Sequence, residues 1–278
     1  MEIKNENPQI IVGILLSCLG LFIGYGMPFF VGGMMTELGF SQTQANYVAS
    51  AEFAGMTIAS LLGIFWITKL NWRKVAIFAL LAIAIGNLVS AYTPNFLALA
   101  IVRFLTAFLG HGTAYALGAA VIGATSNPVR NFGLSGSVQY VMGSLTALLI
   151  PQAMATFGMA GYCIPAMILA IPALLVNTKL QTVKKSISGD EKSSSGLPFL
   201  FLPIAGMFVM IMHQMAHGPL WIRFVPFGTS VGLDAGDVGI ALSIAYGISF
   251  LGPLAAAALA SKMSRNIPVL LALMVQFF

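Results

Sequence analysis

The sequence predicts an all-α membrane protein of about nine hydrophobic helices, with a complete six-helix N-terminal half and about three helices of a second half. Hydrophobic residues make up 58% of the 278 positions and charged residues only 8%, whereas soluble domains carry about 25% charged residues. Apolar stretches recur at lengths near the roughly 20 helical residues that cross a bilayer. They are continuously apolar, without the alternation typical of barrel strands, so helices are favoured.

The first span follows a short polar segment without a basic region or a cleavage site, so we expect a retained helix and not a signal peptide. Cys18 and Cys163 lie inside spans and predict neither a disulfide framework nor a metal site. The polar segment 179–198 predicts a cytoplasmic linker between a bundle at 1–178 and a second bundle at 199–278. The predicted spans are 9–35, 44–68, 75–93, 97–124, 132–156, 160–177, 199–227 and 235–260, with a ninth from Ile267.

Basic residues identify one side of the membrane. With the N-terminus inside, eleven of the thirteen Lys and Arg residues are cytoplasmic, while the opposite loops carry Glu37, Asp234 and Asp237 with Arg223. This bias predicts a multi-pass protein of a plasma membrane, such as a bacterial inner membrane. The charge of +5 falls in short clusters between spans, which excludes a nucleic-acid-binding face. The cytoplasmic residues are Lys4, Lys69, Arg73, Lys74, Arg130, Lys179, Lys184, Lys185, Lys192, Lys262 and Arg265.

An internal repeat relates the two halves at an offset of 193 residues. Gly39-Phe40-Ser41 aligns with Gly232-Leu233-Asp234, and the loop from Thr68 aligns with the loop from Ser261. Both matches fall in loops of equivalent sidedness, which favours a duplication over a chance match. Phe278 then corresponds to position 85 in the third span. We therefore expect a C-terminally truncated second bundle.

Two six-span halves joined by a basic linker resemble the major facilitator superfamily of secondary transporters over the whole chain. The family's loop Gly-x-Leu-Ala-Asp-Arg-x-Gly-Arg-Arg is similar to the loop after the second span, although Thr68 replaces the aspartate. The resemblance implies a monomeric carrier without a cofactor, with spans one, four, seven and ten around a central cavity. The residues of the two signature loops are Thr68, Lys69, Arg73, Lys74, Ser261, Lys262 and Arg265.

Arg103 is the first candidate for transport chemistry, because a charge inside a span needs a partner or a cavity. Glu52 lies at comparable depth in the second span, and Gly55 allows another helix to approach, so we hypothesise an ion pair between Glu52 and Arg103. His111 follows two turns after Arg103 on nearly the same face. Arg103 and His111 are predicted to face a midplane cavity and bind an anionic group or respond to protons; bonding to carbonyls and polar packing are the alternatives. By resemblance, the family's span-four arginine implies proton coupling for Arg103 alone.

His213 and His217 lie one turn apart in the seventh span. Their imidazoles share one face of the helix, which is predicted to face the cavity and to bind protons or substrate. Polar packing is the alternative. A metal ion is not expected, because no third ligand follows at helical spacing.

Glycine and proline interrupt the first and seventh spans at nearly the repeat offset. Matching interruptions in two halves predict a central site and its gate, although membrane helices are rich in both residues generally. The interrupting residues are Gly24, Gly26, Pro28, Gly218 and Pro219.

These patterns predict a proton-coupled secondary transporter of a small organic solute that works by alternating access, with the lipid bilayer, the solute and protons as partners. A channel or a non-transporting scaffold is the alternative. An intramembrane serine protease is considered because Gly133-Leu134-Ser135-Gly136 and Ala216-His217-Gly218 are similar to rhomboid motifs. The sidedness separates Ser135 and His217 by about 20 Å in depth, too far for a nucleophile and its base, so no enzyme activity is expected.

Overall fold

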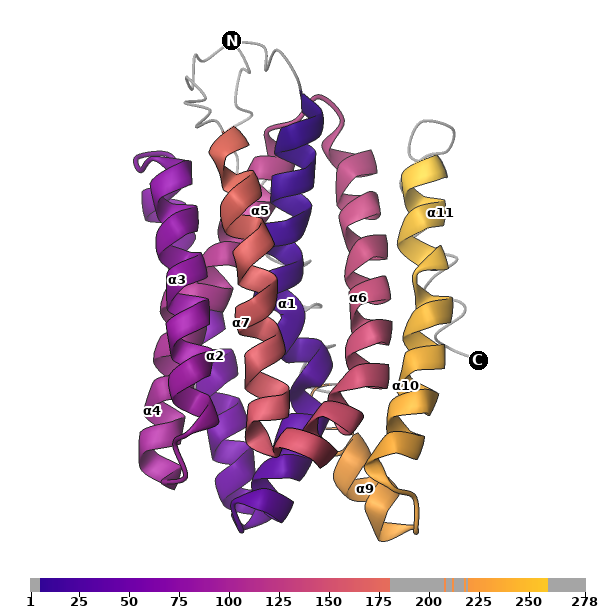
Figure 1. The fold of residues 1–278 in the computed structure, drawn as a ribbon. Helices are drawn as coiled ribbons and strands as arrows, with labels where there is room; N and C mark the ends of the chain where they lie inside the picture. Colours follow the sequence, from indigo (N-terminus) through magenta and orange to yellow (C-terminus); the bar gives the residue numbers. More distant parts are fainter. Residues whose placement is uncertain (1–5, 181–207, 209–211, 213–217, 219, 260–278) are drawn as a thin grey trace.

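The computed structural model describes residues 6–180, 208, 212, 218 and 220–259, and shows a bundle of long, nearly parallel helices (Figure 1). Within these residues seven segments are long and apolar enough to cross a membrane, six of them in residues 6–176 and one at Ala235–Leu259. The all-α membrane fold is therefore confirmed. The predicted ninth span, the linker from 181 onward and most of the seventh span lie outside the described residues.

The six spans of the first half lie within a few residues of their predicted limits. A π-helical turn, Ala107–His111, joins α4 and α5 into one continuous span. The N-terminal bundle consists of α1 (Glu6–Glu37), α2 (Gln42–Trp66), α3 (Trp72–Ala91), α4 (Phe96–Thr106), α5 (Gly112–Gly123), α6 (Pro128–Phe157) and α7 (Met159–Val176), followed by a 3-10 turn at Asn177–Lys179. After residue 220 come α9 (Phe224–Ser230), α10 (Ala235–Ser249) and α11 (Leu251–Leu259).

Side-chain caps explain where several spans begin. Ser41 before α2, Asn71 before α3, Asn95 before α4 and Asn127 before α6 each accept a hydrogen bond from a backbone N–H of the first helical turn. Those N–H groups have no partner inside the helix, and a short polar side chain just outside it supplies one.

The turns before α2 and α10 are built alike at the repeat offset. Gly39 and Gly232 both have positive φ, +67° and +92°, a conformation that favours glycine. Ser41 and Asp234 cap the following helices, and each cap is closed reciprocally by the residue three positions on, Gln44 or Asp237. Both turns lie at the same end of the bundle (Figure 1). The shared geometry supports the internal duplication.

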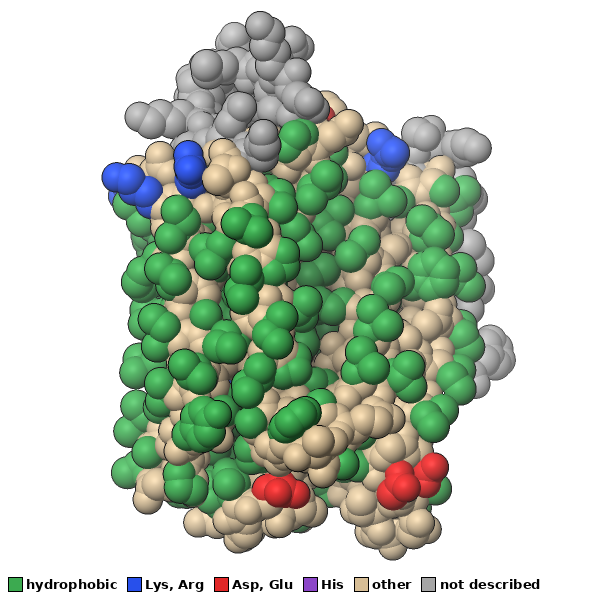
Figure 2. Space-filling view, in the orientation of Figure 1, with side chains coloured by type: hydrophobic (Ala, Val, Ile, Leu, Met, Phe, Trp, Pro, Cys, Tyr) green, Lys and Arg blue, Asp and Glu red, His purple; other side chains and the backbone are tan. Residues whose placement is uncertain are grey.

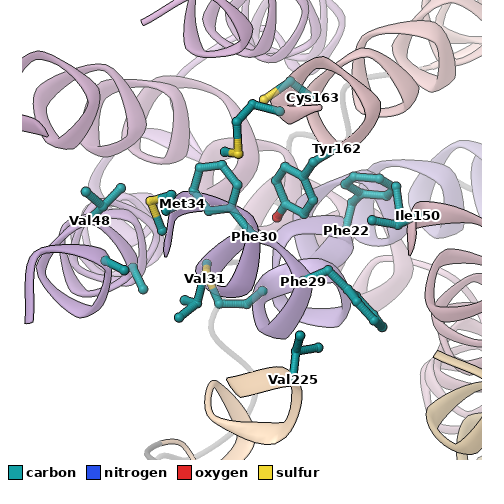
Figure 3. Packing of buried hydrophobic residues seen from close by; sticks show 14 of the residues in the cluster. Phe22, Phe29, Phe30, Val31, Met34, Val48, Ile150, Tyr162, Cys163 and Val225 are labelled. Atoms are coloured by element: carbon teal, nitrogen blue, oxygen red, sulfur yellow. The ribbon is translucent and has the colours of Figure 1, made fainter. Parts of the chain in front are cut away.

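α1 lies inside the N-terminal bundle and contacts α2, α5, α6 and α7. Small residues let the backbones approach: a Cβ added to Gly118 of α5 would lie 2.8 Å from the Gly13 carbonyl oxygen and 2.5 Å from Ser17 Oγ. Phe22, Phe29 and Phe30 of α1 extend from it into the apolar core (Figure 3). This close packing makes α1 the structural axis of the first half.

Most exposed charged residues lie at the two ends of the molecule. In the view of Figure 2 the Lys and Arg side chains lie at the end where α1 begins, and most visible acidic side chains lie at the opposite end. The flanks between them are largely apolar. We call these the basic end and the acidic end.

α6 joins the two halves by packing along α10 and α11. Ser144 Oγ donates to the Ser243 carbonyl oxygen at 2.8 Å, and Ser137 Oγ donates to the Phe250 carbonyl oxygen at 3.2 Å. Gly133 also approaches α11, since an added Cβ there would lie 2.7 Å from the Pro253 carbonyl oxygen. Small and hydroxyl residues thus bring the α6 backbone close to the second half.

The expected break in the first span is wrong, because α1 continues through Gly24, Gly26 and Pro28. Pro28 has no N–H, so the Gly24 carbonyl one turn earlier loses its helical donor. Trp221 Nε1 donates to that carbonyl at 2.9 Å, which compensates for the missing bond. In the seventh span Gly218 is helical, Pro219 lies outside the described residues, and a turn at 222–223 precedes α9.

Candidate functional site

Arg103 lies inside the N-terminal bundle with its side chain fully buried. It belongs to the last turn of α4, directly before the π-helical turn. Such turns are rare and frequent at functional sites, because the extra residue changes the direction of the side chains that follow. The fourth span therefore changes its helical geometry between Arg103 and His111, its two buried candidate residues, and His111 ends the π-helical turn.

The hypothesised ion pair is present: Arg103 Nη2 contacts Glu52 Oε1, and both side chains are fully buried. Gly55 makes this approach possible, because the Phe104 carbonyl oxygen occupies the place that a side chain on Gly55 would fill. An isolated buried charge costs several kcal/mol. Each charge therefore stabilises the other between α2 and α4.

Asn87 of α3 connects Arg103 to His111. Arg103 Nη1 donates to Asn87 Oδ1 at 2.8 Å and to Ser90 Oγ at 3.4 Å. The amide nitrogen of Asn87 lies 2.8 Å from the Ile83 carbonyl oxygen and 3.2 Å from His111 Nε2. With its oxygen toward the guanidinium, the amide presents its nitrogen as a donor to the imidazole.

The partners of His111 determine its tautomer. Its Nδ1 lies 2.7 Å from the Leu19 carbonyl oxygen of α1, a group that can only accept, so Nδ1 carries the proton. Nε2 then accepts from Asn87. A neutral imidazole satisfies both contacts. A doubly protonated imidazole would instead point its Nε2–H at the N–H of the Asn87 amide, so that two donors would face each other. His111 is thus a fully bonded neutral link between α1, α3 and the fourth span.

Two aromatic rings cover the guanidinium. Its central carbon lies 5.0 Å from the centre of the Phe30 ring and 6.0 Å from that of Tyr162. The two rings stack with centroids 4.5 Å apart, and Figure 3 shows them side by side. Tyr162 approaches α1 where Gly26 leaves room, and its hydroxyl donates to the Ile23 carbonyl oxygen at 3.4 Å. Cation–π attraction therefore adds to the pairing with Glu52.

Sequence reasoning missed Asn87, Ser90 and Tyr162. Asn87 and Ser90 are polar residues three positions apart on one face of an apolar span, a signal that would have identified them as partners for a buried charge. Tyr162 gave no comparable signal, because aromatic residues are common in membrane helices.

A cavity of about 520 Å³ lies between the two halves. Its walls come from α1, α2 and α6 on one side, and from α10 with Gly218, Trp221 and Ile222 on the other. None of the described lining residues carries a formal charge. Its aromatic side chains are Tyr25, Phe53, Tyr140, Trp221 and Tyr246.

Arg103, Glu52 and His111 lie elsewhere: they are fully buried within the N-terminal bundle and are not among the residues lining this cavity. The expectation that Arg103 and His111 face it is therefore corrected. The reason is that their partners all lie inside the N-terminal bundle: Glu52 and Arg103 pair with each other, Asn87 of α3 bonds Arg103 and His111, and the Leu19 carbonyl of α1 bonds His111. Gly24 and Gly218 do line the cavity, and neither has a neighbouring atom within 4 Å of an added Cβ.

A second hollow of about 260 Å³ lies toward the acidic end, between α1, α6, α9 and the start of α10. Val225 of α9 packs against α1 here, with its Cγ1 2.8 Å from the position of a Cβ on Gly32. Val225 is buried and lies beside Phe29 (Figure 3). Together with the bond from Trp221 to Gly24, this contact fastens the described part of the seventh span to α1.

The first signature loop lies at the basic end, where Thr68, Lys69, Arg73 and Lys74 are exposed. Asn177 Nδ2 donates to the Arg73 carbonyl oxygen at 3.1 Å and ties the end of α7 to this loop. The other predicted residues, His213, His217, Ser261, Lys262 and Arg265, lie outside the described residues.

Ser135, the serine of the motif similar to rhomboid proteases, has a bonding partner within its own helix. Ser135 is buried in α6, and its hydroxyl oxygen accepts a hydrogen bond from Gln139 Nε2 at 2.8 Å, one turn along the same helix.

Comparisons with known proteins agree with this architecture. The family model described as Major Facilitator Superfamily matches residues 10–278. The chain is 30% identical over 155 residues to YfhI of Bacillus subtilis, an uncharacterised MFS-type transporter, over 54% of this chain and 37% of that protein. The crystal structure of tetrameric PepTSo2 is similar in fold, with a TM-score of 0.50 and 18% identity over 97% of this chain and 57% of that one. The matched part of the chain thus covers little more than a third of YfhI and just over half of PepTSo2.

Proposed function

Since the chain belongs to the major facilitator superfamily, we propose that it is a secondary transporter that moves a small organic solute across a membrane by alternating access. The observation that carries this proposal is the cavity shared by the two halves. A solute bound there contacts α1 and α6 on one side and α10 on the other. Rocking of the halves would then expose it to each side of the membrane in turn.

Two contacts between the halves favour a carrier over an open channel. The hydrogen bond from Trp221 to Gly24 joins the seventh span to α1 at the cavity, and the contact of Val225 with Gly32 joins them at the second hollow, toward the acidic end. In a carrier these contacts separate during the cycle and form again. In a channel a continuous path would be open through this point.

The basic end is assigned to the cytoplasm by the positive-inside rule. Lys69, Arg73, Lys74 and Arg130 all lie in its loops or at the adjoining helix starts. This orientation places the N-terminus inside, as in a protein of the plasma membrane or of a bacterial inner membrane.

Proton coupling is proposed to act through the pair of Glu52 and Arg103. Glu52 Oε1 contacts the guanidinium, while Oε2 has no hydrogen-bond partner among the described residues. A proton arriving at Oε2 would neutralise the carboxylate and weaken the contact between α2 and α4. Because both helices belong to the N-terminal bundle, the protonation state would act on its packing and not by direct contact with the solute.

The test compares the small-molecule content of cells with and without the protein, expressed from its complete reading frame, by mass spectrometry. At least one organic solute is expected to change severalfold, and a protonophore should abolish the difference. Gly24→Leu, which fills open space in the cavity, should abolish it too. Gly252→Leu is the matched control, because Gly252 also has open space but lies outside the cavity lining. Unchanged solute levels, or equal effects of the two leucines, would contradict the proposal.

A further inference from the structure

Aromatic rings form one wall of the cavity between the two halves. The rings of Tyr25 and Tyr246 meet edge to face with centroids 5.0 Å apart, and Tyr140 lies 6.3 Å from Tyr25 and 6.2 Å from Tyr246. Trp221 adds a fourth ring, 5.4 Å from Tyr246. These rings come from α1, α6, α10 and the described end of the seventh span. A ligand in contact with them therefore touches both halves.

The polar groups of this wall are uncharged. The hydroxyls of Tyr25, Tyr140 and Tyr246 have no hydrogen-bond partner among the described residues, unlike that of Tyr162, which bonds to the Ile23 carbonyl. The indole N–H of Trp221 is already used by Gly24. The three tyrosine hydroxyls therefore remain available to donate to or accept from a ligand.

A negatively charged ligand would find no cation in the described wall. Arg103, the fully buried guanidinium of the N-terminal bundle, is held by Glu52, Asn87 and the rings over it. An anion would therefore lose its hydration without a charged partner. The faces of aromatic rings repel negative charge and attract positive charge.

We propose that this cavity binds a flat aromatic solute that is neutral or singly positive, with its ring among Tyr25, Tyr246 and Trp221 and its polar group on a tyrosine hydroxyl. This inference rests on the proposed transport function and names the class of its substrate. The volume of about 520 Å³ lies within the range of small-molecule sites.

Binding to the purified protein in detergent tests the proposal without requiring flux. The probes are 4-nitrobenzyl alcohol, 4-nitrobenzylamine and 4-nitrobenzoate, which share a ring and differ in charge, and the signal is saturable quenching of tryptophan fluorescence. The alcohol and the amine should bind at least about tenfold more tightly than the benzoate. Trp221→Phe should remove the saturable signal, because Trp66 and Trp72 lie outside the cavity.

Variants at Tyr246 locate the site. Tyr246→Leu should weaken binding of the alcohol about tenfold, the loss expected for one aromatic contact, and Tyr246→Phe should weaken it less. Tyr92→Leu is the control, since Tyr92 is 71% exposed and lies outside the cavity lining. If Tyr246→Leu does not fold, Gly24→Leu provides the same test by filling the cavity.

Equal affinities for the three probes, or equal effects of Tyr246→Leu and Tyr92→Leu, would overturn the inference. The two proposals fail separately. Charge-selective binding without solute movement in cells would contradict transport and leave the binding class standing. Solute movement with no preference against the benzoate would contradict the binding class alone.

Discussion

Removing one member of the buried pair should cost more stability than removing both. Glu52→Leu leaves the Arg103 guanidinium with only Asn87 at 2.8 Å, Ser90 at 3.4 Å and two aromatic rings. An unpaired buried charge costs about 3–5 kcal/mol, whereas replacing a whole buried pair by apolar residues is often nearly neutral. We expect Glu52→Leu and Arg103→Met to lose about 3 kcal/mol each. The double variant should lose less than about 3 kcal/mol, which is at least about 3 kcal/mol less than their sum.

The assay is reversible unfolding of the purified protein in mixed micelles, followed by tryptophan fluorescence and analysed as a double-mutant cycle. Glu37→Leu is the control, because Glu37 is an exposed carboxylate at the acidic end and its loss should change the free energy of unfolding by less than about 0.5 kcal/mol. Single-variant losses that add within about 0.5 kcal/mol would refute the coupling. So would a Glu52→Leu variant as stable as Glu37→Leu.

Three further predictions concern packing and hydrogen bonding. Asn87→Leu should lower the free energy of unfolding by about 2–3 kcal/mol, because it leaves buried donors and acceptors unpaired; a loss below 0.5 kcal/mol in the same assay would exclude the network. Gly112→Val should reduce the yield of folded protein on size-exclusion chromatography, since its Cβ would lie 2.7 Å from the Met56 carbonyl oxygen, whereas Gly123→Val meets open space and should express normally. Trp221→Phe should lower the free energy of unfolding by about 1 kcal/mol through loss of one hydrogen bond, and an unchanged value would mean that this bond does not hold the seventh span to α1.

The spans and the charge separation could be predicted because they depend on local composition. A bilayer requires about 20 apolar residues per helix, and the sequence shows each stretch directly. The pair of Glu52 and Arg103 could also be predicted, since two opposite charges at equal depth need each other and Gly55 permits the approach. These are consequences of desolvation and depth, which a single sequence contains.

The cavity wall could not be predicted because it depends on how helices rotate about their axes. Tyr25, Tyr140 and Tyr246 lie more than 100 residues apart in sequence and meet only once α6 packs on α10. For the same reason Arg103 was expected at the cavity, although the face of α4 that carries it turns inward. The continuity of α1 through Pro28 was missed because its compensating donor, Trp221, comes from another helix.

A reversible cross-link at the acidic end tests the alternating-access account most directly. A Cβ on Gly32 would lie 3.5 Å from Val225 Cβ, within the range that a disulfide accepts. In a background where Cys18 and Cys163 are replaced by Ala, oxidised Gly32→Cys/Val225→Cys protein should lose solute movement, and reduction should restore it. Each single cysteine variant should remain active under both conditions. Undiminished movement in fully cross-linked protein would contradict the account, because the halves could not then separate at this end.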